Sequence, residues 1–495
     1  MKIVFPSVIR PVALLGIVSF ACGTKQGNTD KNEKLNVLFI AIDDLRPHLG
    51  CYGFGNVKSP NIDGIAANGL IFKRSYCQFA LSSPSRTSLF TGLNPDVTGV
   101  KGNGPKFRDT IPDLVALPQH FKNNGYFAQG FGKLYHNGLD DPESWTVPHD
   151  RGSKPRYAPE GDEINKRVKA EYVKRSDYVP GTKILANGPP FESYDCADNY
   201  FLDGGNTESA LKALERLKDT TFFLAVGFAN VHIPYVSPKR YWDLYDPGQI
   251  KLPSNQYPPA GAPEWALQSL HELYTYYDVP SPLTEEFKRE LIRGYLAATS
   301  YVDAQIGLLV EALRKYELLD NTVIVIFGDH GYQLGEHYMW SSKHTNYETS
   351  TNAPLIISVP GMKAKGASSN ALVEFIDIYP SLADICGLQI PSHCQGRSFK
   401  ALLDDPSGTI KQETYSQYSK GGYKGYTVRD DQYRLVQWTK GKEVVYELYD
   451  HNADPEENKN IAGDPAMKGI IEKLDAKINT RKQNDINLKR ELIKN

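Results

Sequence analysis

Cysteine is scarce in this chain, and so is any surplus of charge of one sign. Six cysteines in 495 residues are too few for a fold held together by disulfide bonds. Lysine and arginine number 56 against 58 aspartate and glutamate residues, a net charge of -2. This balance excludes a nucleic-acid binder that relies on a basic surface. We therefore expect any anionic ligand to be held by a local site rather than by the field of the whole protein.

Long hydrophobic runs are absent after the N-terminal region. No later segment stays apolar over 18 residues, so we expect the rest of the chain to be soluble. Lys2 and Arg10 precede an apolar stretch over residues 11–21 and then Cys22. This arrangement predicts a signal peptide of the lipoprotein type at residues 1–22, with plain secretion and an uncleaved anchor as alternatives.

The segment after the signal is polar over residues 23–34 and predicts a tether. We therefore expect an exported protein, in the periplasm or on the cell surface of a bacterium. Its only contact with the membrane would be the lipid anchor. Apolar residues make up 40% of the chain and charged residues 23%, which excludes a disordered or fibrous protein.

Four continuous apolar runs predict buried strands. Such runs are typical of strands that are covered on both faces of a parallel sheet. They lie at residues 36–42, 222–227, 323–327 and 354–359. Helical patterns lie between them, at residues 61–67, 114–124, 207–218, 284–313 and 379–386. Strands that alternate with helices predict a three-layer α/β domain, which we place at residues 35–411.

The pattern changes near residue 412. Short alternating segments at 426–429, 433–438 and 444–448, then a polar helix from about residue 464, predict a smaller antiparallel-sheet subdomain at residues 412–495. Residues 141–200 are rich in proline, glycine and charge, and we expect an insertion on the face that carries the site.

The five cysteines after Cys22 leave at least one thiol unpaired. Cys386 and Cys394 are close enough in sequence for a local disulfide, which spacing alone does not establish.

Polar residues follow three of the predicted strands. Asp43 and Asp44 follow the first, His232 the second, and Asp329 with His330 the third. Ligands of open α/β sheets collect at the carboxyl ends of strands, and carboxylates that converge there need a cation to stay ionised. Each group alone is more often a turn, a cap or a structural histidine. Together they predict a site for a hard ion, Ca²⁺ or Mg²⁺, although His330 is compatible with a transition metal.

The segment SSPSRTSLFTG at residues 82–92 carries the most specific pattern. Taken alone, it is a polar loop that opens a helix, with serine capping and proline in the first turn. The order Ser-x-Pro-x-Arg followed by Thr-Gly resembles the signature of type I sulfatases, in which the first residue is oxidised to formylglycine. Within that family the chain is most similar to the iduronate-2-sulfatase branch. The matching segments are DDLRP at 43–47, LGCYG at 49–53, SPNID at 59–63, FFLAVG at 222–227, HIP at 232–234 and LGEH at 334–337.

The resemblance implies an alkaline-phosphatase-like fold with a large mixed, mostly parallel sheet. It also implies that Ser82 becomes formylglycine, whose hydrate attacks sulfur and forms a sulfo-enzyme intermediate. A plain serine hydroxyl is a weak nucleophile for this reaction. Position 82 is serine rather than cysteine, which implies a maturation enzyme of the radical type as a partner. One Ca²⁺ ion would be held by Asp43, Asp44, Ser82, Asp329 and His330.

Five further site residues are implied in the same way. Arg86 would orient residue 82, and Lys133 would hold the hydrate and the sulfate. His136 would be the base that releases sulfate, and His232 the acid at the leaving oxygen. Lys343 would bind sulfate, although the segment from Trp340 to Lys343 has one residue more than the usual Trp-x-Lys spacing. Without the motif, each of them has an ordinary structural explanation, such as a salt bridge, a solvated charge or a capping histidine.

The implied function is removal of sulfate from a sulfated glycan, most simply the 2-O-sulfate of a uronic acid in glycosaminoglycan fragments. Three alternatives stay open. The enzyme could act on a sulfate at another sugar position. It could be a phosphonate or phosphate ester hydrolase on the same scaffold. It could also be a surface lipoprotein that binds glycan without catalysis because Ser82 stays unmodified.

Overall fold

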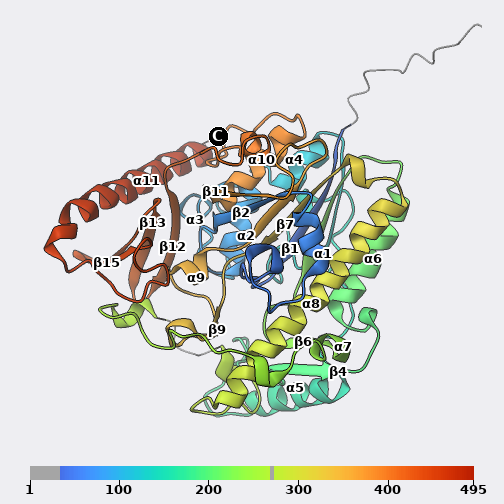
Figure 1. Cartoon of the computed structure of the whole chain (residues 1–495), viewed down its shortest axis with the longest axis horizontal. Coiled ribbons are helices and arrows are strands. Elements are labelled where there is room, and N and C mark those ends of the chain that lie inside the picture. Colours follow the sequence, from blue (N-terminus) through green and yellow to red (C-terminus); the bar gives the residue numbers. More distant parts are fainter. Residues whose placement is uncertain (1–33, 268–271, 495) are drawn as a thin grey trace, which may run out of the picture. The chain divides into compact units, whose positions relative to one another are not determined.

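A large sheet of seven strands forms the centre of the fold (Figure 1). The computed structural model describes residues 34–267 and 272–494. The predicted signal peptide, the anchor at Cys22 and the tether up to residue 33 lie outside the described residues.

The strand order of the large sheet is β11-β2-β10-β7-β1-β5-β3. Strands β7, β1, β5 and β3 run parallel to one another, and β11 runs parallel to β2. The mixed, mostly parallel sheet that was predicted is therefore confirmed. The strand bounds are β1 Asn36–Ile42, β2 Leu70–Tyr76, β3 Phe127–Gly132, β5 Phe222–Phe228, β7 Thr322–Gly328, β10 Leu355–Ser358 and β11 Ala367–Glu374.

The fourth apolar run differs from the expectation for a parallel strand. It forms β10, which is antiparallel to both β7 and β2. The chain between β7 and β10 holds a short hairpin and two short helical turns but no crossover helix, and a parallel return needs a crossover. Strands β2, β3 and β11 were not predicted because their sequences mix polar residues and glycines with apolar ones.

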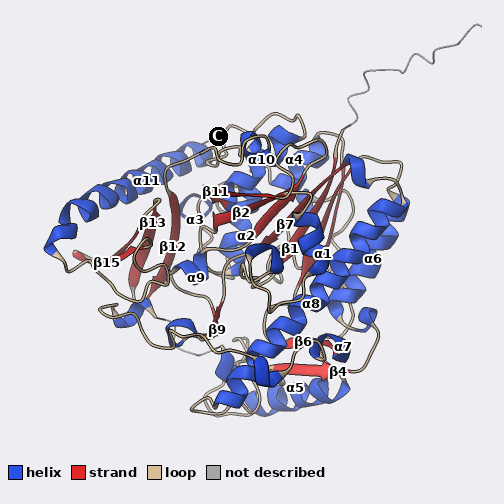
Figure 2. Ribbon diagram, viewed as in Figure 1, coloured by secondary structure: helices blue, strands red, loops and turns tan. Residues whose placement is uncertain are grey.

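Helices cover both faces of the large sheet (Figure 2). On one face, Leu38 and Ile40 of β1 pack with α1, α6 and α8. On the other face, Val37 and Phe39 pack with α2, α4 and α10. This alternation along one strand produces the predicted three layers. The helix bounds are α1 Pro60–Ala66, α2 Ser82–Thr91, α4 Leu117–Asn123, α6 Leu202–Arg216, α8 Glu285–Lys315 and α10 Ile378–Ile385.

Helix α8 is long and apolar enough to cross a membrane by length and composition alone. However, 78% of its most apolar window is buried inside the protein, so it is a core helix of the α/β layers.

A second sheet lies in the C-terminal part of the chain. It contains β12 Thr414–Lys420, β13 Tyr423–Arg429, β14 Tyr433–Lys440 and β15 Glu443–Asp450, antiparallel in sequence order. Helix α11, Lys468–Lys494, packs Leu474 and Ile478 against apolar residues of this sheet. The predicted antiparallel sheet and helix are confirmed, and β12 is one strand more than the sequence indicated.

Short elements complete the fold. Strand β4 of the predicted insertion pairs with β6, which begins three residues after His232. Strands β8 and β9 form a hairpin after β7. The bounds are β4 Phe191–Tyr194, β6 Tyr235–Pro238, β8 Gln333–Leu334, β9 Trp340–Ser342, α3 Pro95–Thr98, α5 Pro159–Tyr172, α7 Lys239–Trp242 and α9 Glu348–Thr351.

Among the described residues, every cysteine is a free thiol. This includes Cys386 and Cys394, so the local disulfide that their spacing allowed is not formed.

Candidate active site

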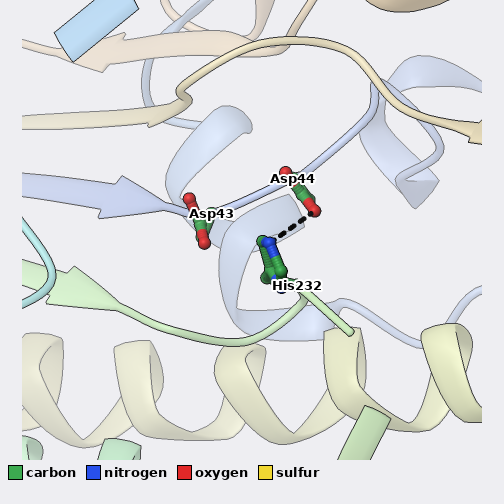
Figure 3. A group of neighbouring side chains, drawn as sticks. All are labelled: Asp43, Asp44 and His232. Atoms are coloured by element: carbon green, nitrogen blue, oxygen red, sulfur yellow. Dashed lines mark ion pairs between the residues drawn. The ribbon is translucent and has the colours of Figure 1, made fainter. Parts of the chain in front are cut away.

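The carboxyl ends of three neighbouring strands meet at one place. Asp43 and Asp44 follow β1, which lies between β5 and β7 in the sheet. His232 comes from the segment after β5, and its ring points toward Asp44 (Figure 3), with Nε2 3.9 Å from Oδ2. Asp329 and His330 follow β7. The parallel register of the three strands thus brings together the five polar residues that the sequence placed after strands.

Carboxylates and one imidazole form the centre of the cluster. Nε2 of His330 lies 3.4 Å from Asp44 Oδ1 and 3.6 Å from Asp329 Oδ2. The backbone N–H of Asp44 donates to Asp329 Oδ1 at 3.0 Å, and Asp44 has a left-handed backbone with φ of 58°. Asp43, Asp44, Asp329 and His330 are all fully buried. Ligand atoms of Asp44, Asp329 and His330 lie within 4.8 Å of one another, the spacing of a metal site.

Ser82 belongs to the same cluster. It is the first residue of α2, and its hydroxyl donates to Asp43 Oδ1 at 3.2 Å and lies 3.2 Å from His330 Nε2. One turn of the helix places Ser85 against the backbone carbonyl of Asp329. The N-terminus of α2, with its partial positive charge, therefore faces the carboxylates.

Arg86 links two carboxylates of the cluster. Its Nε donates to Asp329 Oδ2 at 2.9 Å and its Nη2 to Asp43 Oδ1 at 3.0 Å. Its Nη1 donates to the backbone carbonyls of Lys133 and Leu134. The planar guanidinium group thus fixes the first turn of α2 against the ends of three strands. The Lys133 ammonium forms an ion pair with the other oxygen of Asp43.

Lys343 reaches the cluster from the β8–β9 hairpin. Its Nζ donates to Asp44 Oδ1 at 2.7 Å and to Oδ2 at 2.9 Å. In the hairpin Gln333 pairs with Ser342 and Leu334 with Trp340, so Ser341 is left over in a β-bulge with φ of 47°. The residue that exceeds the Trp-x-Lys spacing is absorbed in this bulge, and the lysine still enters the site.

The pKa shifts of Asp43 and Asp44 support a cation site among these carboxylates. Burial raises the pKa of Asp44 well above its ordinary value, and Asp43 and Asp329 raise it further, although Lys343 opposes them. Burial also acts to raise the pKa of Asp43, but Lys133 and Arg86 hold it well below the ordinary value. The three fixed cations therefore leave Asp44 short of positive charge. Carboxylate oxygens beside one imidazole suit a hard divalent ion.

His330 has the tautomer that a metal ligand needs. Its Nδ1 donates to the carbonyl of Gly331 at 2.9 Å, so Nε2 faces the carboxylates with its lone pair. Burial lowers the pKa of His330 and keeps the ring neutral. These residues therefore fit the divalent ion that the sequence predicts.

The two other histidines are placed differently. Nδ1 of His232 donates to the carbonyl of Ile233 at 2.5 Å, so Nε2 points into the site. Burial lowers the pKa of His232 well below 6.5, and Lys343 adds to this effect. His136 is half-buried, and its Nδ1 has no hydrogen-bond partner among the described residues. Burial and then Lys133 lower the pKa of His136 to about 4. It lies within the electrostatic reach of the cluster but forms no direct hydrogen bond to Ser82 in the described structure.

Glu272 is a site residue that the sequence did not indicate. Its Oε1 lies 3.4 Å from His232 Nε2. Burial acts to raise its pKa, but Lys343 and His232 lower it below the ordinary value, so the carboxylate is ionised. No strand end, motif or spacing marks this position in the sequence. The hydroxyl of Tyr276, four residues later, donates to the carbonyl of Ile233 at 2.8 Å and ties this segment to the His232 loop.

Known families match most of the chain. Residues 35–388 match the family described as Sulfatase, and residues 335–484 match N-sulphoglucosamine sulphohydrolase, C-terminal. Iduronate 2-sulfatase of Homo sapiens is 30% identical, with 91% of this chain and 95% of the human protein covered. A protein named sulfatase from Formosa agariphila is 32% identical, with 94% and 91% covered.

Solved structures show the same fold at lower sequence identity. The phosphonate monoester hydrolase of Agrobacterium radiobacter has a TM-score of 0.72 at 22% identity, with 91% of this chain and 96% of that one covered. The structure of BT1596, a 2-O GAG sulfatase, has a TM-score of 0.67 at 24% identity, with 92% and 94% covered.

Proposed function

We propose that this chain, which belongs to the sulfatase family and is a sulfuric ester hydrolase, removes the 2-O-sulfate of a uronic acid, iduronate or unsaturated uronate, in glycosaminoglycan fragments. The main support is the position of Ser82, whose hydroxyl lies 3.2 Å from both Asp43 Oδ1 and His330 Nε2. Three cationic side chains pair with the aspartates of the same cluster, Arg86 and Lys133 with Asp43 and Lys343 with Asp44. The choice of sugar is supported by the names of two relatives, human iduronate 2-sulfatase and the 2-O GAG sulfatase BT1596.

Sulfatases of this family generally work with formylglycine and a metal ion. We propose that a radical-type maturation enzyme oxidises Ser82, and that Asp43, Asp44, Asp329, His330 and residue 82 hold one Ca²⁺ ion. When present, the aldehyde hydrate supplies a stronger nucleophile than serine, and Ca²⁺ acidifies its oxygen ligands and neutralises charge on sulfate.

The residues around this centre would bind and orient the sulfate group. Lys133 and Lys343 each place an ammonium group on an aspartate of the cluster, where they can move to the oxygens of an incoming sulfate. Arg86 is held by two carboxylates and two carbonyls, so its role is to keep residue 82 in place. Transfer of SO₃ disperses charge over its oxygens, and fixed cations stabilise such a transition state.

Two histidines would move protons. Nε2 of His232 faces the site, 3.4 Å from the ionised carboxylate of Glu272. Nδ1 keeps its hydrogen bond to the Ile233 carbonyl, so His232 would have to take up a proton on Nε2 before it donates that proton to the sugar oxygen as it leaves. His136, with a free Nδ1 and a lowered pKa, would accept a proton in the step that releases sulfate.

We also propose that the protein is exported and held at a membrane by a lipid on Cys22. The support is the basic and apolar segment before Cys22 in the sequence. Replacement of Cys22 by alanine should move the protein from the membrane fraction to the soluble fraction of cells. Equal amounts of the unaltered protein and the alanine variant in the membrane fraction would contradict the lipid anchor.

The substrate proposal is tested with defined disaccharides that each carry one sulfate at one known carbon. Sulfate release should be fastest from the 2-O-sulfated uronate and should disappear in Ser82→Ala. Faster release from another carbon would identify a different sugar sulfate. Faster hydrolysis of a phosphonate monoester would favour a phosphonate or phosphate ester hydrolase. Binding of the sulfated disaccharide without turnover, by both the unaltered protein and Ser82→Ala, would favour a glycan-binding protein.

A further inference from the structure

The loop that carries Lys343 is held from behind by the C-terminal sheet. We define this loop as residues 343–348; it follows β9 and ends at Glu348, the first residue of α9. The side-chain amide of Asn346 donates to the carbonyl of Tyr418 on β12 at 3.2 Å, and the ring of His344 stacks on the Tyr418 ring. Strands that come 70 or more residues later in the sequence therefore pack against one side of this loop.

Arg434 on β14 is the centre of this contact. The residue is fully buried, and its guanidinium group donates in three directions. Nε donates to Glu457 Oε1 at 2.6 Å, Nη1 donates to the carbonyl of Asn346 at 3.3 Å, and Nη2 forms an ion pair with Glu348. Two of these three partners belong to the loop that carries Lys343.

Glu457 closes the network on the backbone of the same loop. Its Oε2 accepts the backbone N–H of Glu348 at 2.7 Å, and its Oε1 lies 2.9 Å from His451 Nε2. Both the side chain and the backbone of Glu348 are thus fixed by residues of the C-terminal part. The remaining oxygen of Glu348 accepts the hydroxyl of Tyr76 at 3.0 Å.

A second buried carboxylate holds the residue next to Glu348. Glu447 on β15 is fully buried and accepts the hydroxyl of Tyr347 at 2.9 Å. It also accepts the indole N–H of Trp438 and the hydroxyl of Tyr449, each at 2.6 Å. Successive loop residues are therefore bound by separate anchors on the same sheet.

The backbone of Lys343 is connected to these anchors through a short path. The hydroxyl of Ser350 donates to the carbonyl of Lys343 at 2.8 Å and accepts from Thr345 at 2.7 Å. The carbonyl of Ser350 accepts the backbone N–H of Gly331, the residue after His330, at 3.0 Å. A shift of residues 345–348 would therefore move both Lys343 and the end of β7.

Buried ion pairs such as these stabilise a fold little compared with apolar packing, because their desolvation offsets their attraction. A fully satisfied polar network does hold its members in one geometry. Lysine has a long flexible side chain, so the position of its ammonium group depends on a fixed backbone. A displacement of about 1 Å at a reacting centre can reduce the rate by about a hundredfold.

We propose that Arg434 is a positioning residue, which acts through Glu348 and the carbonyl of Asn346 to fix the backbone that presents Lys343 to the site. Arg434 of the C-terminal sheet would thus support sulfate binding indirectly, through the loop, and would not itself contact the substrate. The inference rests on the proposed function in one respect, the role of Lys343 as a sulfate ligand.

The test is a double-mutant cycle in the full-length chain. Glu348→Gln keeps the size of the side chain but removes its charge, and Lys343→Met removes the ammonium group. We expect Glu348→Gln to lower kcat/KM for the sugar sulfate about tenfold, mainly through KM, in the otherwise unchanged enzyme. In the Lys343→Met background it should lower kcat/KM less than about twofold, because the group being positioned is gone.

Two further variants separate positioning from general stability. Arg434→Lys keeps the charge but replaces the planar fork of the guanidinium with a compact ammonium group, which cannot span Glu457, Glu348 and the Asn346 carbonyl together. It should therefore reproduce the loss caused by Glu348→Gln. Lys477→Met breaks an ion pair between α11 and Glu413 in the same C-terminal part and should leave kcat and KM unchanged. An equal loss from Lys477→Met, or an equal loss from Glu348→Gln in both Lys343 backgrounds, would overturn the proposal.

Amide hydrogen exchange provides a readout that does not depend on activity. Exchange over residues 343–348 should become faster in Glu348→Gln and Arg434→Lys, and it should stay unchanged in Lys477→Met. If the unaltered enzyme releases no sulfate, the proposed function fails, and the exchange result still decides whether Arg434 holds the loop. Unchanged exchange in both network variants would refute the positioning role.

Discussion

Ser82 is the residue on which the chemistry depends. Its hydroxyl lies among carboxylates and beside the ring nitrogen of His330. A plain serine hydroxyl is a weak nucleophile, and the oxidation that we propose would replace it with the stronger aldehyde hydrate. Ser82→Ala should therefore abolish sulfate release while the thermal unfolding midpoint changes by no more than about two degrees, because only one hydroxyl is lost. Sulfate release and a thermal melt of the same sample check both parts. Undiminished turnover by the variant would remove Ser82 from the mechanism.

His232 makes a second prediction at this scale. If Nε2 of His232 protonates the leaving oxygen, its loss should matter only for leaving groups that need a proton. His232→Ala should therefore lower kcat/KM about a hundredfold or more for a sugar sulfate and about tenfold or less for an activated aryl sulfate. Parallel assays of the two substrates give this comparison, and equal losses would argue against the acid role.

The sequence predicts site residues best where a motif or a strand end marks them. Asp43, Ser82 and Asp329 lie in such segments, and the structure brings all three together. Glu272 lies in a loop with no recognisable pattern, and only the folded chain brings its carboxylate to His232. Long-range contacts of this kind depend on the path of the loop, which composition and periodicity do not determine.

At the scale of elements, the β8–β9 hairpin explains how an extra residue is tolerated. A strand with one added residue would turn every later side chain to the opposite face. The bulge at Ser341 absorbs the addition, so Lys343 still points to Asp44. The sequence reveals the extra residue but not the bulge, because bulge formation depends on the pairing partner, Gln333.

The buried network around Glu457 should make the stability of the fold sensitive to acid. Burial alone would raise the pKa of Glu457, but Arg434 and then His451 lower it from 4.5 to about 2. A carboxylate with a lowered pKa stabilises the folded state above its unfolded pKa, and this contribution is lost as the pH falls through the folded value. The contribution is on the order of 3 kcal/mol at neutral pH and should disappear between about pH 5 and pH 2.

Comparison with Glu457→Gln measures this contribution. The variant should melt several degrees below the unaltered protein at pH 7, since it leaves Arg434 without one carboxylate. The difference in melting midpoint should shrink as the pH approaches 3. A difference that stays constant over this range would show that the charge of Glu457 does not stabilise the fold.

At the scale of the whole molecule, the strand order of the large sheet brings the site residues together. Segments that start near residues 43, 82, 232, 329 and 343 converge because β1, β5 and β7 are adjacent and parallel, and because α2 and the β8–β9 hairpin pack at the same edge. The sequence predicted the three layers and the central strands from their continuous apolar runs. It did not predict the edge strands β3 and β11. Gln129 and two glycines interrupt the apolar run of β3, which is buried after Phe127, whereas β11 exposes Ser368 and Asn370 to solvent.

Metal removal is a prediction for the whole molecule. A divalent ion that binds the buried carboxylates of the folded chain, and not the unfolded chain, would stabilise the fold. Ca²⁺ at about a hundred times its dissociation constant should stabilise the fold by about 2.7 kcal/mol and raise the melting midpoint by a few degrees. A melt in chelator against a melt in Ca²⁺ measures this shift, and Asp44→Asn should abolish most of it. Identical midpoints in the two buffers would contradict the ion site.

The mass of the peptide that contains residue 82 tests most directly whether an oxidised side chain is the nucleophile. The protein should be produced together with a radical-type maturation enzyme and assayed for sulfate release before digestion. We expect an active preparation in which this peptide is about 2 Da lighter than the encoded sequence, since oxidation of serine to formylglycine removes two hydrogens. An equally active preparation whose peptide has the mass of unmodified serine would contradict it.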